Sequence, residues 1–282
     1  MVERTRPRTG GSAGRTATPR SAYRERGRSA KGGRRYRPTV TDTLARWAIC
    51  IALGVSWVVL TQWRAPDGTL RAAARAALGG GAAFSLSLLA YGLLQRAGLA
   101  PTWEEVVRGG AGAVGAAVLV GLVEEGGKLA GAALAGRERP PRNESEALRY
   151  VAGVSSAFAA LEAGLALAGV PWSLLVVRAA FAPVVHTMLA APMAPALAPG
   201  SRRVRLRRVG AGVAFAVWAH ALGDWGVARG GEGLAAGALG ASLPAFWLFV
   251  RARRAVGWPM PWEQAAVALK RLRGRTIGAG AR

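Results

Sequence analysis

The chain has 282 residues, of which 51% are hydrophobic, a further 39 are glycine and only 19% are charged. A soluble globular domain carries more charge and fewer apolar residues, so these figures favour a membrane protein over a soluble enzyme. The formal net charge of +23 is almost entirely arginine, and no zinc-finger spacing or helix-turn-helix accompanies it, so it does not indicate a nucleic-acid-binding protein. Cys50 is the single cysteine, which excludes an intrachain disulfide and a thiolate metal site.

The first segment, residues 1–41, consists mainly of Arg, Gly, Ser, Thr and Pro. It has too little apolar surface to offset the entropy lost on ordering, so we expect a disordered basic tail. Its arginines can attract anionic lipid headgroups, and the simpler alternative is a solvated tail without a function of its own. No convincing signal-peptide cleavage site follows the first apolar run.

Seven apolar stretches follow the tail, each long enough to cross a hydrocarbon core that takes roughly 17–25 helical residues. They cover residues 47–63, 76–95, 109–135, 151–170, 172–199, 209–228 and 233–250. Glycine and alanine are dense in them, as expected where membrane helices pack closely, and the alternation of a membrane barrel is absent. We therefore expect an all-α fold, a polytopic transmembrane bundle of about seven (seven to eight) spans over residues 42–250. The cell (plasma) membrane is the expected location.

The connections between these stretches differ in arginine content. Residues 64–75, 136–150 and 200–208 carry three, four and five arginines, whereas the connections on the opposite side carry only three in total. The positive-inside rule places the arginine-rich set in the cytoplasm, although seven spans would then put the basic tail outside. Residues 251–282 are expected to form a basic amphipathic segment along the membrane surface.

Ionisable groups inside membrane spans are costly and usually mark a functional site. Eight occur within the apolar stretches, and they include both histidines of the protein: Glu124, Glu125, Lys128, Glu162, Arg178, His186, His220 and Asp224. The simplest structural roles are a self-neutralising Glu124–Lys128 pair and an Arg178 that balances Glu162 or Asp224. These roles do not account for two histidines and several carboxylates together.

Helical periodicity indicates which of these groups face the interior. Glu124 and Lys128 are four residues apart and lie on one face, where they can pair. Glu125 points about 100° away and continues a stripe of small residues, which is a close-packing face. His220 and Asp224 are also four residues apart, so we expect Asp224 to orient the His220 ring.

Four short motifs in this order resemble those of the PrsW family of intramembrane proteases, which is distantly similar to CAAX-prenyl endopeptidases and bacteriocin-processing membrane proteases. The motifs are E-E-x-x-K at Glu124, Glu125 and Lys128, F-x-x-x-E at Phe158 and Glu162, R-x7-H at Arg178 and His186, and H-x-x-x-D at His220 and Asp224. The resemblance covers about residues 109–228. Gly126 and Gly127 depart from it, because the family commonly has bulkier apolar residues there, and they are expected to loosen the helix.

The resemblance implies an intramembrane metalloprotease that cuts a membrane-anchored protein, such as an anti-sigma factor. The residues are compatible with two mechanisms. In one, Glu124 or Glu125 deprotonates water while the second glutamate and Glu162 position it, and the histidines donate to the oxyanion. In the other, His186, His220 and a carboxylate hold Zn²⁺ with a bound water. A serine triad, a cysteine nucleophile and an H-E-x-x-H zincin site are not indicated.

Two other classes of protein can bury such groups. An ion-coupled transporter uses them as a proton relay, but the chain lacks the internal repeat that is common in transporter folds. A non-catalytic scaffold or immunity-type protein is expected to have a broken motif, and all four motifs are intact. The residue pattern therefore favours a protease.

Overall fold

The computed structural model describes residues 39–63, 65–99, 101, 103–109, 111–166 and 171–229, together with scattered positions between 237 and 250. The described part of the chain is helical and contains no strand, so the all-α expectation is confirmed there. The helices are α2 (Val40–Thr61), α3 (Thr69–Arg96), α4 (Trp103–Arg108), α5 (Ala111–Ala135), α6 (Glu144–Ala166), α7 (Trp172–Ala190), the 3₁₀ turn η1 (Ala191–Met193), α8 (Ala194–Leu197) and α9 (Arg202–Arg229).

Six of the seven predicted spans coincide with these helices, with shifted ends. The stretch 172–199 is not one straight helix, because α7 gives way at Ala191 to η1 and α8, where Pro192 and Pro195 interrupt the regular hydrogen bonding. The stretch 209–228 forms part of α9, which begins seven residues earlier in the arginine-rich segment. The tail up to residue 38, most of the span 233–250 and all of the segment 251–282 lie outside the described residues.

Three helical stretches among the described residues are long and apolar enough to cross a membrane: α2, α3 and Trp172–Leu197. Their outer faces carry large apolar side chains, of which Leu78, Leu89 and Phe181 are 74%, 60% and 63% exposed. Exposed apolar surface of this extent marks a contact with a partner or with lipid. The helices thus support a membrane protein, and the count of seven spans stays a prediction.

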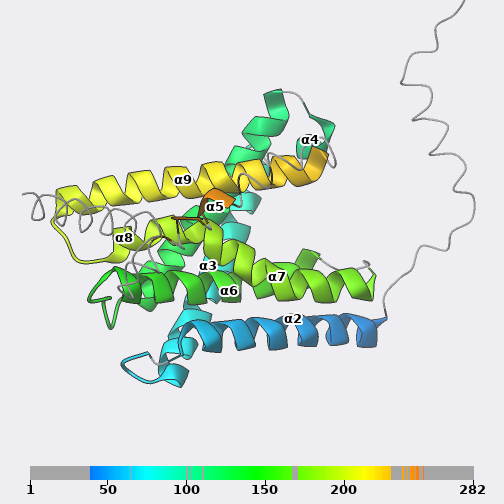
Figure 1. Cartoon of the computed structure of the whole chain (residues 1–282). Helices are drawn as coiled ribbons and strands as arrows, with labels where there is room; N and C mark the ends of the chain where they lie inside the picture. The colour runs from blue at the N-terminus through cyan, green and yellow to red at the C-terminus, as the bar shows by residue number, and fades with distance from the viewer. Residues whose placement is uncertain are drawn as a thin grey trace, which may run out of the picture. The chain divides into compact units, whose positions relative to one another are not determined.

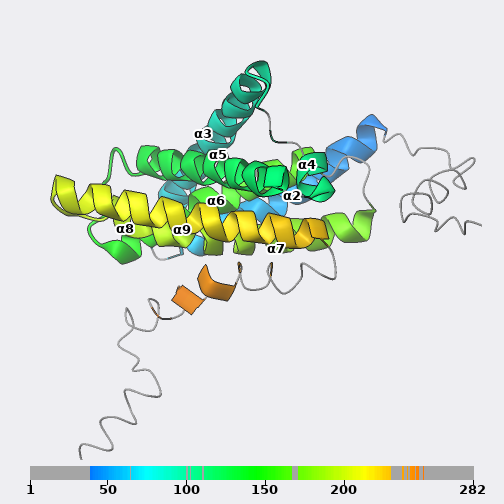
Figure 2. The same cartoon turned by 90° about the horizontal axis from the view of Figure 1, so that it is seen from above.

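Figures 1 and 2 show how the helices are arranged. In Figure 1, α2, α7 and α9 run nearly parallel across the view, and in Figure 2 α3 is inclined to α5 and α9. The most extensive packing joins α3 to α5 and α6, α6 to α2 and α7, and α5 to α9. Helices α5 and α6 therefore lie between the outer elements, and side chains on their inner faces are shielded.

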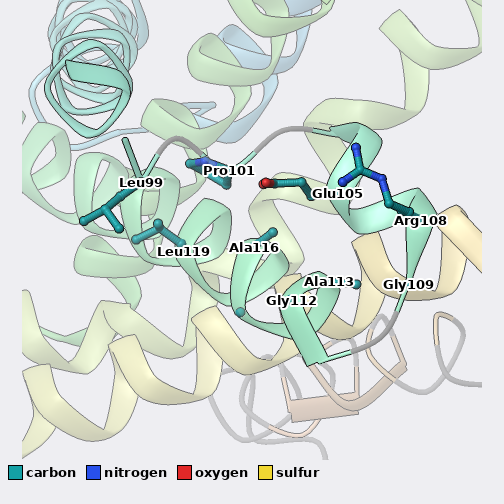
Figure 3. A pocket seen from close by; sticks show the side chains of 10 residues that line it. Leu99, Pro101, Glu105, Arg108, Gly109, Gly112, Ala113, Ala116 and Leu119 are labelled. Carbon is teal, nitrogen blue, oxygen red and sulfur yellow. The ribbon is translucent and has the colours of Figure 1, made fainter. Parts of the chain in front are cut away.

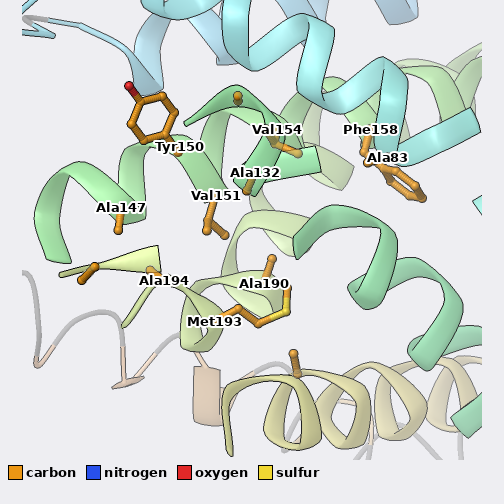
Figure 4. Packing of buried hydrophobic residues seen from close by; sticks show 13 residues of the cluster. Ala83, Ala132, Ala147, Tyr150, Val151, Val154, Phe158, Ala190, Met193 and Ala194 are labelled. Atoms are coloured by element: carbon orange, nitrogen blue, oxygen red, sulfur yellow. The ribbon is translucent and has the colours of Figure 1, made fainter. Parts of the chain in front are cut away.

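Small residues allow α3 to lie directly on α5. A Cβ added to Gly79 would come within 2.6 Å of the Gly131 carbonyl oxygen, so neither position has room for a side chain. Around this crossing, Figure 4 shows Ala83 of α3 and Val154 and Phe158 of α6 in the main core cluster. Close backbone approach and dispersion contacts hold such a bundle where lipid removes the hydrophobic drive between helices.

Helix α7 contains a proline within its length, at Pro183. A proline has no N–H to donate and disturbs the preceding turn. The indole N–H of Trp57 on α2 donates to the carbonyl oxygen of Ala180 at 3.0 Å, in the turn before the proline. This contact joins α2 to the part of α7 that lies between Arg178 and His186.

Two of the three arginine-rich connections lie against each other. Asp67, between α2 and α3, pairs with Arg75 and lies 2.9 Å from Arg139, which follows α5. Partial burial raises the pKa of Asp67, but the hydrogen bond from Arg75 and the positive charges of Arg75 and Arg139 outweigh it and hold that pKa below its usual value. Two of the predicted same-side connections are therefore in contact.

The close approach of α3 and α5 makes a direct prediction. We expect Gly79→Ala to destabilise the protein by about 1–3 kcal/mol, because the new methyl group meets backbone that cannot move aside. Gly81→Ala on the same helix is the matched control, since a Cβ there has no atom within 4 Å, and it should be neutral or slightly stabilising. Thermal unfolding in detergent measures both, and equal midpoints would contradict the packing.

Candidate functional site

All eight predicted ionisable residues lie in one cluster between the helices. They come from α5 (Glu124, Glu125 and Lys128), α6 (Glu162), α7 (Arg178 and His186) and α9 (His220 and Asp224). Each lies within 4.0 Å of another member through an ion pair or a hydrogen bond, and together they form one connected network. Residues up to 100 positions apart in sequence are therefore neighbours in space.

Lys128 is at the centre of the network. Its ammonium is fully buried and donates to Glu125 Oε1 at 2.6 Å and to His186 Nδ1 at 2.8 Å. Glu124 Oε2 is 3.7 Å away, and the ammonium also lies 4.7 Å from the centre of the Phe158 ring. A buried ammonium is costly unless charge and hydrogen bonds compensate it, and these contacts supply both. The predicted Glu124–Lys128 pair is thus present, but the shorter contact is to Glu125.

Glu125 connects α5 to α9. Its Oε1 atom accepts a hydrogen bond from His220 Nδ1 at 2.8 Å, and its side chain has no exposed surface. The helices come close enough for this contact because Gly121 lies one turn earlier, where a Cβ would be 3.0 Å from the Val217 carbonyl oxygen. The small-residue stripe that ends at Glu125 is therefore the surface on which α9 packs.

Glu162 connects α6 to α7 and uses both carboxylate oxygens. Its Oε2 atom lies 2.9 Å from His186 Nε2, and its Oε1 atom lies 3.4 Å from the guanidinium of Arg178. Because the Lys128 ammonium can only donate, His186 Nδ1 accepts, and the ring proton is on Nε2 and is donated to Glu162. Arg178 is half-exposed and pairs with Glu162, one of the two partners considered for it.

Asp224 lies at the edge of the network. Its Oδ2 atom is 3.5 Å from His220 Nε2, in the position expected for a residue that orients this ring. The contact of His220 Nδ1 with Glu125 is shorter, at 2.8 Å, so Glu125 is the stronger determinant of the ring's orientation. Helical periodicity predicted that His220 and Asp224 share one face of α9. It did not predict that His220 Nδ1 contacts Glu125 on α5.

The pattern of charges missed Tyr91, which belongs to the site. Its hydroxyl group donates to Glu124 Oε1 at 3.2 Å from α3, a helix whose apolar stretch has no charged residue. Ser87, one turn earlier, lies 3.3 Å from the Val123 carbonyl oxygen on α5. The sequence does contain a signal for this contact, because Ser87 and Tyr91 are polar residues four positions apart in an apolar span and therefore share one face of the helix.

The adjacent glycines do not interrupt α5, which is an unbroken helix from Ala111 to Ala135. A Cβ at Gly127 would lie 2.6 Å from Ser87 Oγ and 3.0 Å from the Ala83 carbonyl oxygen, whereas a Cβ at Gly126 would meet no atom within 4 Å. The expected loosening at this pair is therefore not observed. Gly127 instead allows α3 to approach the site and place Tyr91 beside Glu124.

Among the described residues, one group of donor atoms could hold a metal ion, and it includes one of the two predicted histidines. Donor atoms of Glu124, Glu162 and His186 all lie within 4.8 Å of one another, as zinc or another divalent cation requires. His186 was predicted as a ligand and belongs to this group. His220, the second predicted ligand, is not in this group, and its role as a ligand stays a prediction.

A separate groove of about 290 Å³ lies where α4 meets the start of α5 (Figure 3). Its walls are formed by Leu99, Pro101, Glu105, Arg108, Gly109, Gly112, Ala113, Gly115, Ala116 and Leu119. None of the eight ionisable residues lines it, so this groove is separate from the network.

No family model, curated protein or solved structure matches this chain. The similarity to the PrsW proteases therefore depends on the four motifs alone.

The burial of Lys128 predicts a large effect of its removal. We expect Lys128→Met to destabilise the protein by about 3–5 kcal/mol, because it leaves Glu124 and Glu125 buried without their cation. Arg178→Met is the matched comparison and should cost at most about 1 kcal/mol, since Arg178 is half-exposed. Thermal unfolding of the two variants in detergent would contradict this view if their midpoints fell equally.

Proposed function

We propose that the protein is an intramembrane endopeptidase that hydrolyses a peptide bond in a membrane-anchored protein. The observation that carries the proposal is the convergence of the eight ionisable residues, from four helices, on one buried network. Charged groups are expensive in such an interior, and a purely structural role needs only paired charges. In this protein, both histidines and four carboxylates belong to one network with Lys128 at its centre.

Peptide hydrolysis requires a base for water, donors for the developing oxyanion and an acid for the leaving amine. A glutamate of the 124–125 pair is the base, and the shielded interior increases its electrostatic effect on bound water. The rings of His186 and His220 are the proposed donors, and the Nε2–H group of His186 would have to leave Glu162 to take this role. Arg178 and Lys128 hold Glu162 and His186 in place.

A bound Zn²⁺ is compatible with the same residues. The donor atoms of Glu124, Glu162 and His186 are close enough to share one ion, and Glu124 Oε2 is buried without a hydrogen-bond partner. The site also holds four carboxylates against two permanent cations, Lys128 and Arg178. A Zn²⁺ ion held there would supply an activated water and a Lewis acid.

The substrate class follows from the surroundings of the site and from the motif resemblance. The helices that carry the network pack beside helices with exposed apolar faces, which suit lipid. A protein with a membrane anchor can reach such a site, and an anti-sigma factor is an example of the class that the resemblance implies. We place the protein in the plasma membrane as a multi-pass protein whose basic tails contact anionic lipid.

Cleavage can be tested before any substrate has been identified. New N-termini of membrane proteins are labelled and sequenced from cells that express the wild type, Glu125→Ala or His186→Ala. We expect peptides that appear only with the wild type, because both variants remove a member of the network. Glu138→Ala, an exposed residue between α5 and α6, is the control and should cleave normally. Normal processing by both network variants would refute the assignment.

The zinc form of the mechanism has its own test. Elemental analysis of detergent-purified protein should find about one zinc per chain in the wild type and in His220→Ala, and none in His186→Ala or Glu162→Gln. The different result for the two histidines follows from the geometry of the ligand group. Zinc lost equally from both histidine variants would instead support the His186–His220 pair, and a cleaving protein without metal would support glutamate-activated water.

A further inference from the structure

The groove between α4 and the start of α5 is lined by charged side chains at one end and by apolar side chains at the other. Glu105 and Arg108 are three residues apart on α4, which places them on one face of that helix. In Figure 3, Leu99 and Leu119 lie at the opposite end of the view from Arg108. A cavity that offers a carboxylate, a guanidinium and apolar walls is suited to an amphiphile with charges of both signs.

The floor of the groove is open because it consists of glycine and alanine. A Cβ added to Gly112 or Gly115 would meet no described atom within 4 Å. Further along the same helix, Gly121 instead lies against α9, where a Cβ would be 3.0 Å from the Val217 carbonyl oxygen. Helix packing therefore explains Gly121 but not the two glycines of the groove. The volume of about 290 Å³ is close to the lower end of small-molecule sites, roughly 300–1,000 Å³, and suits a headgroup better than a whole lipid.

The groove faces away from the ionisable network. Nine residues of an α-helix turn through about 900°, so Gly115 and Glu124 point in opposite directions, about 180° apart. Gly112 and Glu125 are separated by thirteen residues and point about 140° apart. A ligand in the groove is therefore not the substrate of the network, and its binding does not depend on the proposed peptide hydrolysis.

Helix α3 places the groove near the end of a segment that is able to cross a membrane. Its 28 residues extend about 42 Å, which equals the thickness of a bilayer with its headgroup layers, about 40–45 Å. The helix ends at Arg96, three residues before Leu99 of the groove. The wall of the groove therefore begins where α3 leaves the hydrocarbon core, which is the level of phospholipid headgroups.

We propose that the groove binds one phospholipid whose headgroup carries a phosphate and a primary ammonium. The guanidinium of Arg108 donates to the phosphate oxygens, and the ammonium donates to the carboxylate of Glu105. The glycerol and the first part of an acyl chain lie on Gly112 and Gly115 and extend toward Leu99. An anionic headgroup without an ammonium would leave its charge beside Glu105, and a choline headgroup has no N–H group to donate to that carboxylate.

Native mass spectrometry of the detergent-purified full chain measures this binding, with dioleoylphosphatidylethanolamine as the probe and dioleoylphosphatidylcholine as its comparison. We expect the wild type to bind the ethanolamine lipid about 10-fold more tightly, since one charge-assisted hydrogen bond distinguishes the two lipids. Gly115→Leu fills the groove and should abolish this tight binding. Gly92→Leu on α3 is the matched control, because a Cβ there also meets no described atom within 4 Å and Gly92 does not line the groove.

The two charged side chains have different expected effects. Glu105→Gln should make the affinities for the two lipids equal, because a neutral amide no longer attracts the ammonium. Arg108→Gln should weaken the binding of both lipids about 10-fold, because both contain the phosphate. A thermal midpoint within a few degrees of wild type confirms that each variant is folded.

Equal affinities of the wild type for the two lipids, or unchanged binding by folded Gly115→Leu, would overturn the proposal. Tighter binding of dioleoylphosphatidylglycerol than of the ethanolamine lipid would also overturn it, because it would indicate an anionic-lipid site. Displacement of the bound lipid by an equal concentration of water-soluble glycerophosphoethanolamine would contradict it too, since the apolar end of the groove would then contribute nothing. If Gly115→Leu does not fold, Glu105→Gln decides in its place, and a retained preference for the ethanolamine lipid refutes the site.

Discussion

The buried ammonium of Lys128 is the constraint on which the rest of the site depends. In an apolar bundle this charge must be neutralised and hydrogen-bonded, and its short contacts are Glu125 on its own helix and His186 on α7. Glu125 in turn binds His220 on α9, and His186 binds Glu162 on α6. The requirements of one cation therefore join four helices and determine which faces of them meet.

Such a network forms only where the backbones come close, and small residues make this possible. Gly79 and Gly131 let α3 lie against α5, Gly127 brings α3 close beside Glu124, and Gly121 admits α9 beside Glu125. In water the burial of large apolar side chains would drive this packing, but among lipids close contact and interhelical hydrogen bonds replace that drive. The glycine-rich composition and the polar interior are therefore linked, because polar side chains of neighbouring helices meet where glycine lets the backbones lie close together.

Burial away from water makes these charges costly in free energy, and it also strengthens their electrostatic interactions. At low effective dielectric, a carboxylate or imidazole acts on a bound water far more strongly than it would in solvent. Among the described residues of the network, Arg178 is half-exposed and Glu162 and Asp224 are partly exposed, so these three lie at its edge. Lys128 and Glu125, in contrast, are fully buried.

The sequence by itself determined the all-helical class, the approximate extent of six helices and the identity of the eight ionisable residues of the network, because apolar length and helical period are local properties. It also placed Glu125 and His220 on inward faces. It could not distinguish the two adjacent glutamates, pair His220 with Glu125, include Tyr91 or show that α7 ends at Ala191. Those features depend on which helices touch and at what height, and only the tertiary packing of α3, α5 and α9 decides that.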